Sequence, residues 1–387
     1  MVAPSLVGCD SVAAYKQGKG AQVRRPINKE KKAHHIKKMK LLLIRFSALG
    51  DVAMLAPVLR LYAQEHPDDD LTVLSKPFHA PLFDEIAPNV HFLGRDPKRD
   101  YKGIRGLYRL FSELHQMHFD MVIDMHDVLR TKILRKFFRV HGYPVRHIDK
   151  HRSLRRRITA PEGKKQLQRL PTSFENYAAV LYGKLFEAQT LSELTREESK
   201  GITHSLPCRE GRGGSLSIGL APFAAHQGKI YPVERMEKVI EMLIEKCPEC
   251  KIILFGGGGK EREQMTAWSE KFSNVVLASE EVKERGLSYD NPLKNELEIM
   301  KTLDVMVSMD SGNMHMASLV GTRVVSIWGA THPWAGFLGW GQSEADCVQR
   351  HDLKCRPCSI YGNKPCLRGD MECMNISEEE IAKRILR

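Results

Sequence analysis

Residues 304–333 read "DVMVSMDSGNMHMASLVGTRVVSIWGATHP" and combine two strand patterns with one helix pattern. The apolar run 304–309 and the apolar run 322–329 each predict a strand buried on both faces, because neither shows polar alternation. The small-residue stretch between them, from 312, predicts a helix. Strand, helix and strand in this order predict a parallel sheet.

The same alternation extends through both halves of the chain, and it predicts an α/β protein. In the first half, strands are expected at 40–46, 71–75, 90–93, 121–125 and 145–148, and helices from Asp51 and near 78–87, 103–118, 128–141 and 173–186. In the second half, further strands are expected at 216–222, 251–257 and 274–279, and further helices from Pro232, from Lys260 and near 294–302.

Two such halves predict two Rossmann-like domains that face each other across a cleft, over 39–195 and 216–376. The polar, glycine-containing stretch 196–215 is typical of a linker. Residues 377–387 predict a terminal helix, for which Ser377 has the spacing of an N-cap. Residues 1–38 are expected to form a disordered basic tail.

The positive charge gathers in two segments of the 387-residue chain, whose formal net charge is +12. Residues 1–38 hold nine Lys or Arg against two acidic residues, and residues 130–169 hold fourteen against two. Such segments attract nucleic acid, anionic lipid headgroups or a phosphorylated acceptor, although both could equally be solvated surfaces.

The sequence contains no apolar run of the roughly 20 residues that span a bilayer. Its first residues also lack the continuous apolar run, about 7–15 residues long, of a secretory signal peptide. We therefore expect a cytoplasmic protein.

Two loops after strands carry candidate catalytic groups. In "RFSALGDVAM" (45–54), Gly50 permits a tight turn, and Asp51 stands at the mouth of a helix. Asp51 fits either an N-cap or a general base that faces a cleft. In "APFAAHQGKIYPVERM" (221–236), Lys229 suits a diphosphate partner beside a helix N-terminus, or is one more exposed lysine.

Two further loops suggest nucleotide binding. Four glycines in "LFGGGGKEREQM" (254–265) let a ligand approach the backbone, and Glu261 could accept hydrogen bonds from ribose or simply favour the helix dipole. In the opening stretch, the backbone N–H groups of 311–313 can bind phosphate oxygens. Asp310 fits sugar hydroxyls better than phosphate, and His315 falls within the first helical turn.

With these four loops in order, residues 39–387 resemble glycosyltransferase family 9, the ADP-heptose:lipopolysaccharide heptosyltransferases. The stretches that carry the resemblance are "IRFSALGDVAMLAPVLRLY", "KIYPVERM", "LFGGGGKERE" and "VSMDSGNMHMASLVGTRVVSIWGATHPW". The resemblance implies a GT-B fold, with the acceptor bound mainly by 39–195 and the nucleotide sugar by 216–376. It implies inverting transfer of a heptose from ADP-heptose to the Kdo or heptose of a lipid A precursor, in the lipopolysaccharide inner core.

The resemblance also implies roles for individual residues. Asp51 would be the catalytic base, and Lys229 would steady the departing diphosphate. The implied donor-binding residues are Lys229, Glu261, Asp310, Ser311, Gly312, Asn313, His315 and Thr331. The implied acceptor-binding residues are Ser47, Asp124, His126 and Arg130, although His126 stands where related enzymes commonly have glutamine.

We expect no required cofactor, because a cation and helix N-termini can stabilise the charge on the departing ADP. We also expect a monomer, whose basic segment 130–169 could meet a phosphorylated, lipid-linked acceptor at the inner face of the inner membrane. The alternative is a GT-B transferase or epimerase that uses another nucleotide sugar. No specific nucleic-acid partner is expected, because no recognition motif accompanies the charge. A Rossmann dehydrogenase is disfavoured because neither first strand–helix turn contains GxGxxG.

Four cysteines cluster near the C-terminus. Cys355, Cys358, Cys366 and Cys373 have C-x2-C spacing in the first pair only. Four thiolates could hold a structural zinc ion, but disulfides or free thiols fit the spacing as well.

Overall fold

Two parallel β-sheets organise the computed structural model, which describes residues 38–183 and 215–387. The confirmed fold class is therefore α/β with parallel sheets. Nearly all of the expected tail (1–38) and of the expected linker (196–215) lies outside the described residues, as do 184–195. The domain boundaries within 39–376 stay predictions.

The first sheet has the strand order β3-β2-β1-β4-β5, with every pairing parallel. Its strands are β1 (Lys40–Ile44), β2 (Asp70–Ser75), β3 (Val90–Gly94), β4 (Met121–Asp124) and β5 (Val145–His147). The helices of this half are α1 (Leu49–Ala53), α2 (Leu55–Glu65), α3 (Gly103–His115), α4 (Leu129–Val140), α5 (Arg152–Ile158) and α6 (Ser173–Tyr182), with 3-10 turns η1 (Pro77–Leu82) and η2 (Glu162–Lys164).

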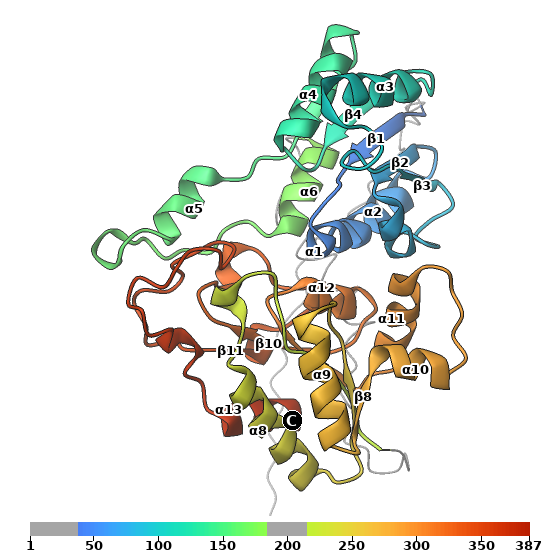
Figure 1. Ribbon diagram of the computed structural model, residues 1–387. Coiled ribbons are helices and arrows are strands. Elements are labelled where there is room, and N and C mark those ends of the chain that lie inside the picture. The colour runs from blue at the N-terminus through green and yellow to red at the C-terminus, as the bar shows by residue number, and fades with distance from the viewer. Residues whose placement is uncertain (1–37, 184–214) are drawn as a thin grey trace, which may run out of the picture. The chain divides into compact units, whose positions relative to one another are not determined.

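The second sheet has the order β11-β10-β9-β6-β7-β8, again entirely parallel (Figure 1). Its strands are β6 (Ser217–Ala221), β7 (Lys251–Leu254), β8 (Val275–Leu277), β9 (Val305–Met309), β10 (Val324–Trp328) and β11 (Cys347–Gln349). Its helices are α8 (Val233–Lys246), α9 (Lys260–Lys271), α10 (Ala278–Glu284), α11 (Pro292–Met300), α12 (Gly312–Leu319) and α13 (Glu378–Ile385), with 3-10 turns η3 (Gln227–Lys229), η4 (Pro333–Ala335), η5 (Glu344–Asp346) and η6 (Glu372–Met374).

Strand burial explains why the expected strands form. Residues 41–44 and 305–309 are at most 2% exposed, which is the double-sided burial that unbroken apolar runs predict. The helices cover the sheets with the apolar sides of their amphipathic surfaces. The buried residues of α8, for example, recur at the helical spacing Met236, Val239, Ile240 and Leu243.

The strand order locates the places where ligands bind. In a doubly wound sheet, the chain leaves in opposite directions from two neighbouring central strands, and a crevice opens beyond their carboxyl ends. These neighbours are β1 and β4 in the first sheet, and β6 and β9 in the second. The loops after these four strands contain most of the predicted site residues.

Four elements differ from the prediction. Helix α10, which was not predicted, begins at Ala278, within the strand expected at 274–279. The helix expected at 78–87 is only the 3-10 turn η1, which contains Pro81, because proline lacks the N–H that an α-helix needs. Helix α5 was not predicted, since its sequence RSLRRRI offers little apolar periodicity. Strand β11 is three residues long and was too short to recognise.

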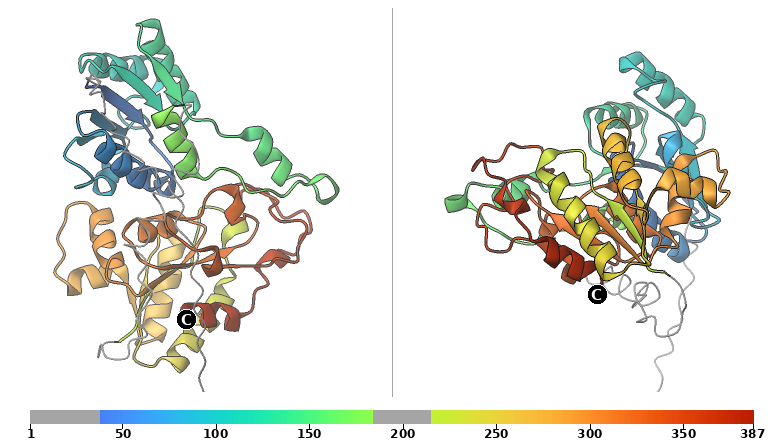
Figure 2. Two further views of the ribbon diagram at one scale, coloured as in Figure 1. Left: turned by 180° about the vertical axis from the view of Figure 1, so that it is seen from behind. Right: turned by 60° about the horizontal axis from the view of Figure 1, so that its bottom comes forward.

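The terminal helix α13 confirms the prediction for Ser377, whose hydroxyl accepts the Glu380 N–H at 3.1 Å. Figure 2 shows α13 beside α8, and the two helices pack together. Among the helices of residues 38–183 and 215–387, none has the length and apolar character to cross a membrane.

Candidate active site

A buried arginine, Arg45, forms an ion pair with the predicted base, Asp51. Arg45, directly after β1, places Nη2 2.5 Å from Oδ2 of Asp51. Its Nη1 donates to the carbonyl of Met125 at 2.5 Å, at the end of β4, and its guanidinium lies 5.6 Å from the Tyr177 ring. Because Arg45 is only 6% exposed, its charge acts on Asp51 with little screening by water. The sequence reasoning missed Arg45, which it treated as the end of an apolar strand.

Asp51 is the third residue of α1, whose N-cap is Ala48. The N-cap alternative for Asp51 is therefore wrong, although its carboxylate does accept the Ala48 N–H at 3.3 Å. Burial raises the pKa of Asp51, but Arg45, the Ala48 N–H and His315 together outweigh burial, so the pKa lies below its usual value. The carboxylate is thus ionised at neutral pH, and its side chain is 26% exposed.

A cavity of about 220 Å³ opens at Asp51, between the loops after β1 and β4. Two predicted acceptor residues line it, Ser47 and His126, whose Oγ and Nε2 lie 3.3 Å apart. Burial, Arg45 and Lys150 lower the pKa of His126 to about 3, so the imidazole is neutral. Its Nδ1 is buried with no hydrogen-bond partner among the described residues.

The other two predicted acceptor residues lie elsewhere. Asp124 is fully buried, and its Oδ1 accepts the N–H groups of His126 and Asp127 at 2.9 Å. Its Oδ2 accepts from Arg135 at 3.1 Å. Asp124 therefore shapes the loop that carries His126. Arg130 is partly exposed near the start of α4 and is not among the residues that line the cavity.

On the second sheet, Lys229 and Asp310 form an ion pair, with Nζ 2.9 Å from Oδ2. Lys229 ends the 3-10 turn η3 after β6, and Asp310 follows β9. Both side chains are largely buried, at 14% and 4% exposure. The strand order explains the pair, because β6 and β9 are neighbours.

His315 lies close enough to Asp51, which follows β1, and to Lys229 and Asp310, which follow β6 and β9, to interact electrostatically with all three. It lies in the first turns of α12, only 6% exposed, and its Nδ1 has no hydrogen-bond partner among the described residues. Burial lowers its pKa to about 4; Asp310 and Asp51 act in the opposite direction, and Lys229 lowers it further. All four predicted residues therefore lie near one another.

The contact between α1 and α12 depends on glycine. A Cβ atom added at Gly50 would lie 2.4 Å from Cδ2 of His315, which is closer than real Cβ contacts. Ser311 is the N-cap of α12, and its hydroxyl lies 3.1 Å from that of Ser308. The first N–H groups of α12, at Gly312 and Asn313, have no partner within an α-helix and can meet an anion.

Thr331 is fully buried, and its hydroxyl has no partner among the described residues. Its carbonyl accepts from the buried Arg356 at 2.9 Å. Arg356 also donates to the carbonyls of Trp328 and Gly329, at 3.0 and 2.6 Å. Arg356, which the sequence reasoning missed, therefore fixes the loop after β10 in place.

Glu261 is the second residue of α9 and accepts the Gly257 N–H at 2.9 Å. The carboxylate therefore spans the glycine loop after β7, as expected of a helix-start residue beside that loop. Among the described residues, Glu261 forms no hydrogen bond or ion pair with Lys229 or Asp310, and its predicted contact with the ribose stays a prediction.

The four C-terminal cysteines are free thiols. Within the described residues, no group of three or more His, Cys, Asp or Glu side chains has the arrangement of a metal site. The zinc alternative therefore gains no support, and the disulfide alternative is wrong for these four residues. Burial raises the pKa of Cys373 to about 11, which favours the thiol.

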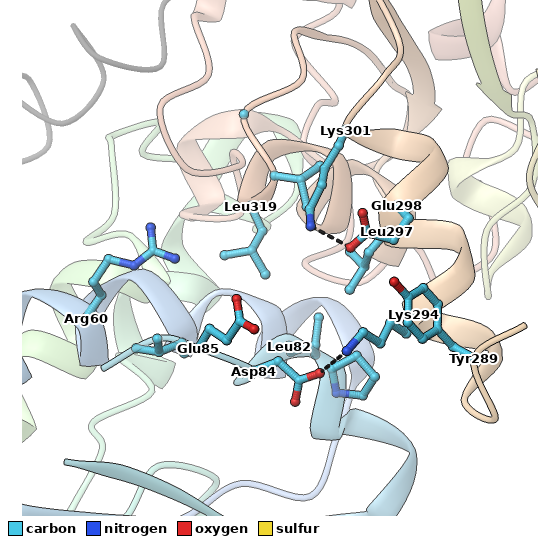
Figure 3. A pocket seen from close by; sticks show the side chains of 14 residues that line it. Arg60, Leu82, Asp84, Glu85, Tyr289, Lys294, Leu297, Glu298, Lys301 and Leu319 are labelled. Atoms are coloured by element: carbon cyan, nitrogen blue, oxygen red, sulfur yellow. Dashed lines mark hydrogen bonds and ion pairs between the residues drawn. The ribbon is translucent and has the colours of Figure 1, made fainter. Parts of the chain in front are cut away.

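A second cavity, of about 580 Å³, is lined by residues after β2 and on α11 (Figure 3). Lys294 of α11 lies 3.1 Å from Asp84, and Asn291 donates to the carbonyl of Phe78 at 3.1 Å. Figure 3 also shows Lys301 paired with Glu298. None of the predicted site residues lines this cavity, and two of its three cations, Lys294 and Lys301, already have carboxylate partners.

Known proteins resemble this chain in sequence and in fold. The lipopolysaccharide heptosyltransferase 1 of Campylobacter coli is 22% identical over 311 residues, which cover 76% of this chain and 84% of the relative. A structure of E. coli ADP-heptose lps heptosyltransferase II is 16% identical, with a TM-score of 0.59 over 90% of this chain and 98% of the other.

A family 9 glycosyltransferase structure from Veillonella parvula is 19% identical, with a TM-score of 0.62 over 90% of this chain and 97% of the other. At such identities the two structures establish a shared fold. The model of glycosyltransferase family 9 (heptosyltransferase) matches residues 107–364, about two thirds of the sequence. The chain therefore belongs to glycosyltransferase family 9, the heptosyltransferases, and is a glycosyltransferase of GT-B fold.

Proposed function

We propose that this glycosyltransferase moves a heptose from ADP-heptose, with inversion, to a hydroxyl of the Kdo or heptose of a lipid A precursor. The observation that carries the proposal is the meeting of Asp51, Lys229 and Asp310 around His315. An ionised carboxylate and a lysine ammonium that both lie near one imidazole suit a transfer that removes a proton from the acceptor and releases a diphosphate from the donor.

In the proposed reaction, Asp51 takes the proton of the acceptor hydroxyl as its oxygen attacks the anomeric carbon. The bond from that carbon to the ADP oxygen breaks, and negative charge grows on the departing diphosphate. Lys229 and the first N–H groups of α12, at Gly312 and Asn313, would stabilise that charge. Asp310 would accept hydrogen bonds from the heptose.

The remaining residues have supporting roles in the proposal. Ser311 and Thr331 would complete the donor pocket, and Glu261 would bind the ribose. Ser47 and His126 would contact the acceptor, because they line the cavity beside Asp51. Asp124 would act by holding the His126 loop. The proposal includes no cofactor, because Lys229 and the first N–H groups of α12 would stabilise the charge on the departing ADP.

The acceptor in this proposal is phosphorylated and lipid-linked, so the enzyme would work at the cytoplasmic face of the inner membrane. We propose that it does so as a monomer. The basic residues of 130–169 fit such an acceptor in charge. ADP as the nucleotide is supported by the E. coli heptosyltransferase WaaC, solved with ADP, whose fold matches this chain with a TM-score of 0.56.

A binding titration against ADP, UDP, GDP and NAD tests the nucleotide. We expect selective ADP binding that weakens with Lys229→Ala and is unchanged by Lys246→Ala, a matched loss of charge at an exposed residue at the end of α8. Preference for UDP or GDP would overturn the ADP-heptose assignment. Release of ADP together with a heptosylated acceptor would then establish transfer, whereas an epimerase would leave the acceptor unchanged.

A further inference from the structure

The cysteine segment, residues 355–373, is tied by backbone hydrogen bonds to two loops of the site. The carbonyl of Ala330, in the loop after β10, accepts the Cys358 N–H at 3.1 Å. The Gly362 carbonyl accepts the N–H of Gly228, in the loop after β6, at 3.2 Å. The loop after β6 is the one that carries the predicted catalytic lysine, so the cysteine segment is anchored directly beside that residue.

Gly362 of the cysteine segment lies against the carbon chain of Lys229. Its φ is +71°, a left-handed conformation that glycine adopts at no steric cost. A Cβ atom added at Gly362 would lie 2.6 Å from Cγ of Lys229 and 3.4 Å from its Cδ and Cε. Since 2.6 Å is closer than real Cβ contacts, only glycine lets the backbone approach the lysine in this way.

We propose that Gly362 is a positioning residue: it supports the carbon chain of Lys229 and thereby aims the ammonium at the departing diphosphate. The inference rests on the proposed function, in which Lys229 stabilises that diphosphate. It adds a role in the transfer for the part of the cysteine segment that includes Gly362.

A lysine needs such support more than an arginine does. Its ammonium stands at the end of a flexible four-carbon chain, whereas a guanidinium is a rigid, planar fork. Nζ of Lys229 lies 2.9 Å from Oδ2 of Asp310, but a diphosphate would compete with Asp310 for this ammonium. The contact with Gly362 involves the carbon chain and persists whichever anion the ammonium meets. The charge is therefore in place before the reaction, which is the condition for efficient electrostatic stabilisation.

Arg356 makes this part of the cysteine segment rigid enough to act as a support. Its side chain is 4% exposed. It donates from Nε to the Gly329 carbonyl at 2.6 Å and from Nη2 to the side-chain oxygen of Gln349 at 3.1 Å. Residues 356–362 therefore move away from Lys229 only if buried hydrogen bonds break.

The test compares Gly362→Asn with Gly369→Asn. Both glycines belong to the cysteine segment and have positive φ, +71° and +79°, but a Cβ atom added at Gly369 would meet nothing within 4 Å. Asparagine is chosen because it tolerates the left-handed conformation better than most residues with a side chain. The clash at Gly362 involves a flexible side chain, so we expect Lys229 to rotate and its ammonium to leave Asp310.

Gly362→Asn should lower kcat/KM for ADP-heptose by about 10–100-fold, because a displacement of roughly 1 Å in a catalytic group can cost this much. Most of the loss should fall on kcat, since the ammonium meets the greatest negative charge in the transition state. Gly369→Asn should change kcat less than about twofold. Gly362→Ala adds the Cβ atom alone and should reproduce the loss, so the test does not depend on one substitution.

The Lys229→Ala background shows whether Gly362 acts through the lysine. In that background, Gly362→Asn should cause no further loss of kcat, because the chain that Gly362 supports is gone. An equal loss of kcat with and without Lys229 would overturn the proposal, since residue 362 would then act independently of the lysine.

Lysine labelling separates this inference from the proposed function. The side chain of Lys229 is only 14% exposed, so acetic anhydride should modify it slowly. Gly362→Asn should raise the labelling rate of Lys229 severalfold relative to the exposed Lys246, measured by mass spectrometry, and Gly369→Asn should not. Unchanged labelling in a folded Gly362→Asn protein would overturn the inference even if heptose transfer were established. Increased labelling with full kcat would instead refute the role of Lys229 in the proposed function.

Discussion

Nη2 of Arg45 lies 2.5 Å from Oδ2 of Asp51, so the predicted base is paired with a buried cation in the same loop. The pair joins the end of β1 to the first turn of α1. A general base with a lowered pKa is ionised over a wide pH range, at the expense of intrinsic basicity. Arg45 thereby determines the lowest pH at which Asp51 can accept a proton.

Arg45→Met should move the acid limb of the kcat/KM profile to higher pH. Without the guanidinium, burial dominates and the pKa of Asp51 rises, so the carboxylate becomes protonated at pH values where the wild type is still ionised. The pH dependence of kcat/KM measures the shift, and Arg45→Lys, which keeps the charge, should reduce it. An unmoved acid limb in Arg45→Met would show that Asp51 is not the titrating base.

Asp51→Asn should lower kcat by roughly 10²–10⁴-fold, the usual contribution of a general base, and leave ADP affinity unchanged. Asp149→Asn is the matched control, because Asp149 lines the same cavity but is 76% exposed and interacts with His151. Single-turnover kinetics separate the chemical step from product release. Comparable losses in both variants would point to the charge of the cavity, and not to a base at residue 51.

Lys229→Ala should destabilise the protein as well as weaken ADP binding. It would leave the Asp310 carboxylate buried and without a counter-charge, and breaking a buried pair in this way costs up to about 3–5 kcal/mol. The double variant Lys229→Met/Asp310→Asn should recover most of that stability in urea unfolding, because no unpaired charge remains. It should not recover ADP affinity. Recovery of both would mean that the pair is structural only.

The sequence indicated most of the strands and the loops that follow them correctly, because apolar runs and polar strand ends are local signals. Ser377, for instance, was recognisable as an N-cap from four residues. Arg45 and Arg356 could not be recognised in this way. Their roles depend on carbonyls and carboxylates that the fold brings from distant parts of the chain, such as Met125 for Arg45 and Trp328 for Arg356.

Two features could not be read from the sequence for a similar reason: whether Asp51 is an N-cap, and which part of the basic segment 130–169 forms helix α5. Whether Asp51 is an N-cap depends on where α1 begins, and a shift of three residues changes the answer. The basic segment 130–169 was visible as charge, but which of its arginines face a cavity depends on Tyr361, about 200 residues away.

Lower pH should destabilise the protein through its buried histidines. Burial lowers the pKa of His79, His315 and His332 to about 4, and that of His126 to about 3. The unfolded chain, with histidine pKa values near 6.5, binds more protons below that pH, so stability falls as pH drops from about 6.5 towards 4. Each histidine contributes up to about 1.4 kcal/mol per pH unit.

Urea unfolding at pH 7.5 and pH 5 checks this expectation. His126→Asn should reduce the difference between the two pH values, because it removes one group that must stay neutral. His147→Asn, at an exposed histidine, is the control and should leave the difference unchanged. Equal stability of the wild type at both pH values would contradict the argument.

Gly50→Ala should cost about 1–3 kcal/mol of stability, because the added methyl group would lie 2.4 Å from Cδ2 of His315 and force α1 and α12 apart. Gly312→Ala, in the facing turn, is the matched control, since its added Cβ would approach Leu49 and the Gly50 nitrogen no closer than an ordinary 3.6 Å. Thermal unfolding compares the two. The double variant Gly50→Ala/His315→Ala should regain stability, because the truncated side chain leaves room for the methyl group. If Gly50→Ala were as stable as Gly312→Ala, the close approach of α1 and α12 through His315 would be disproved.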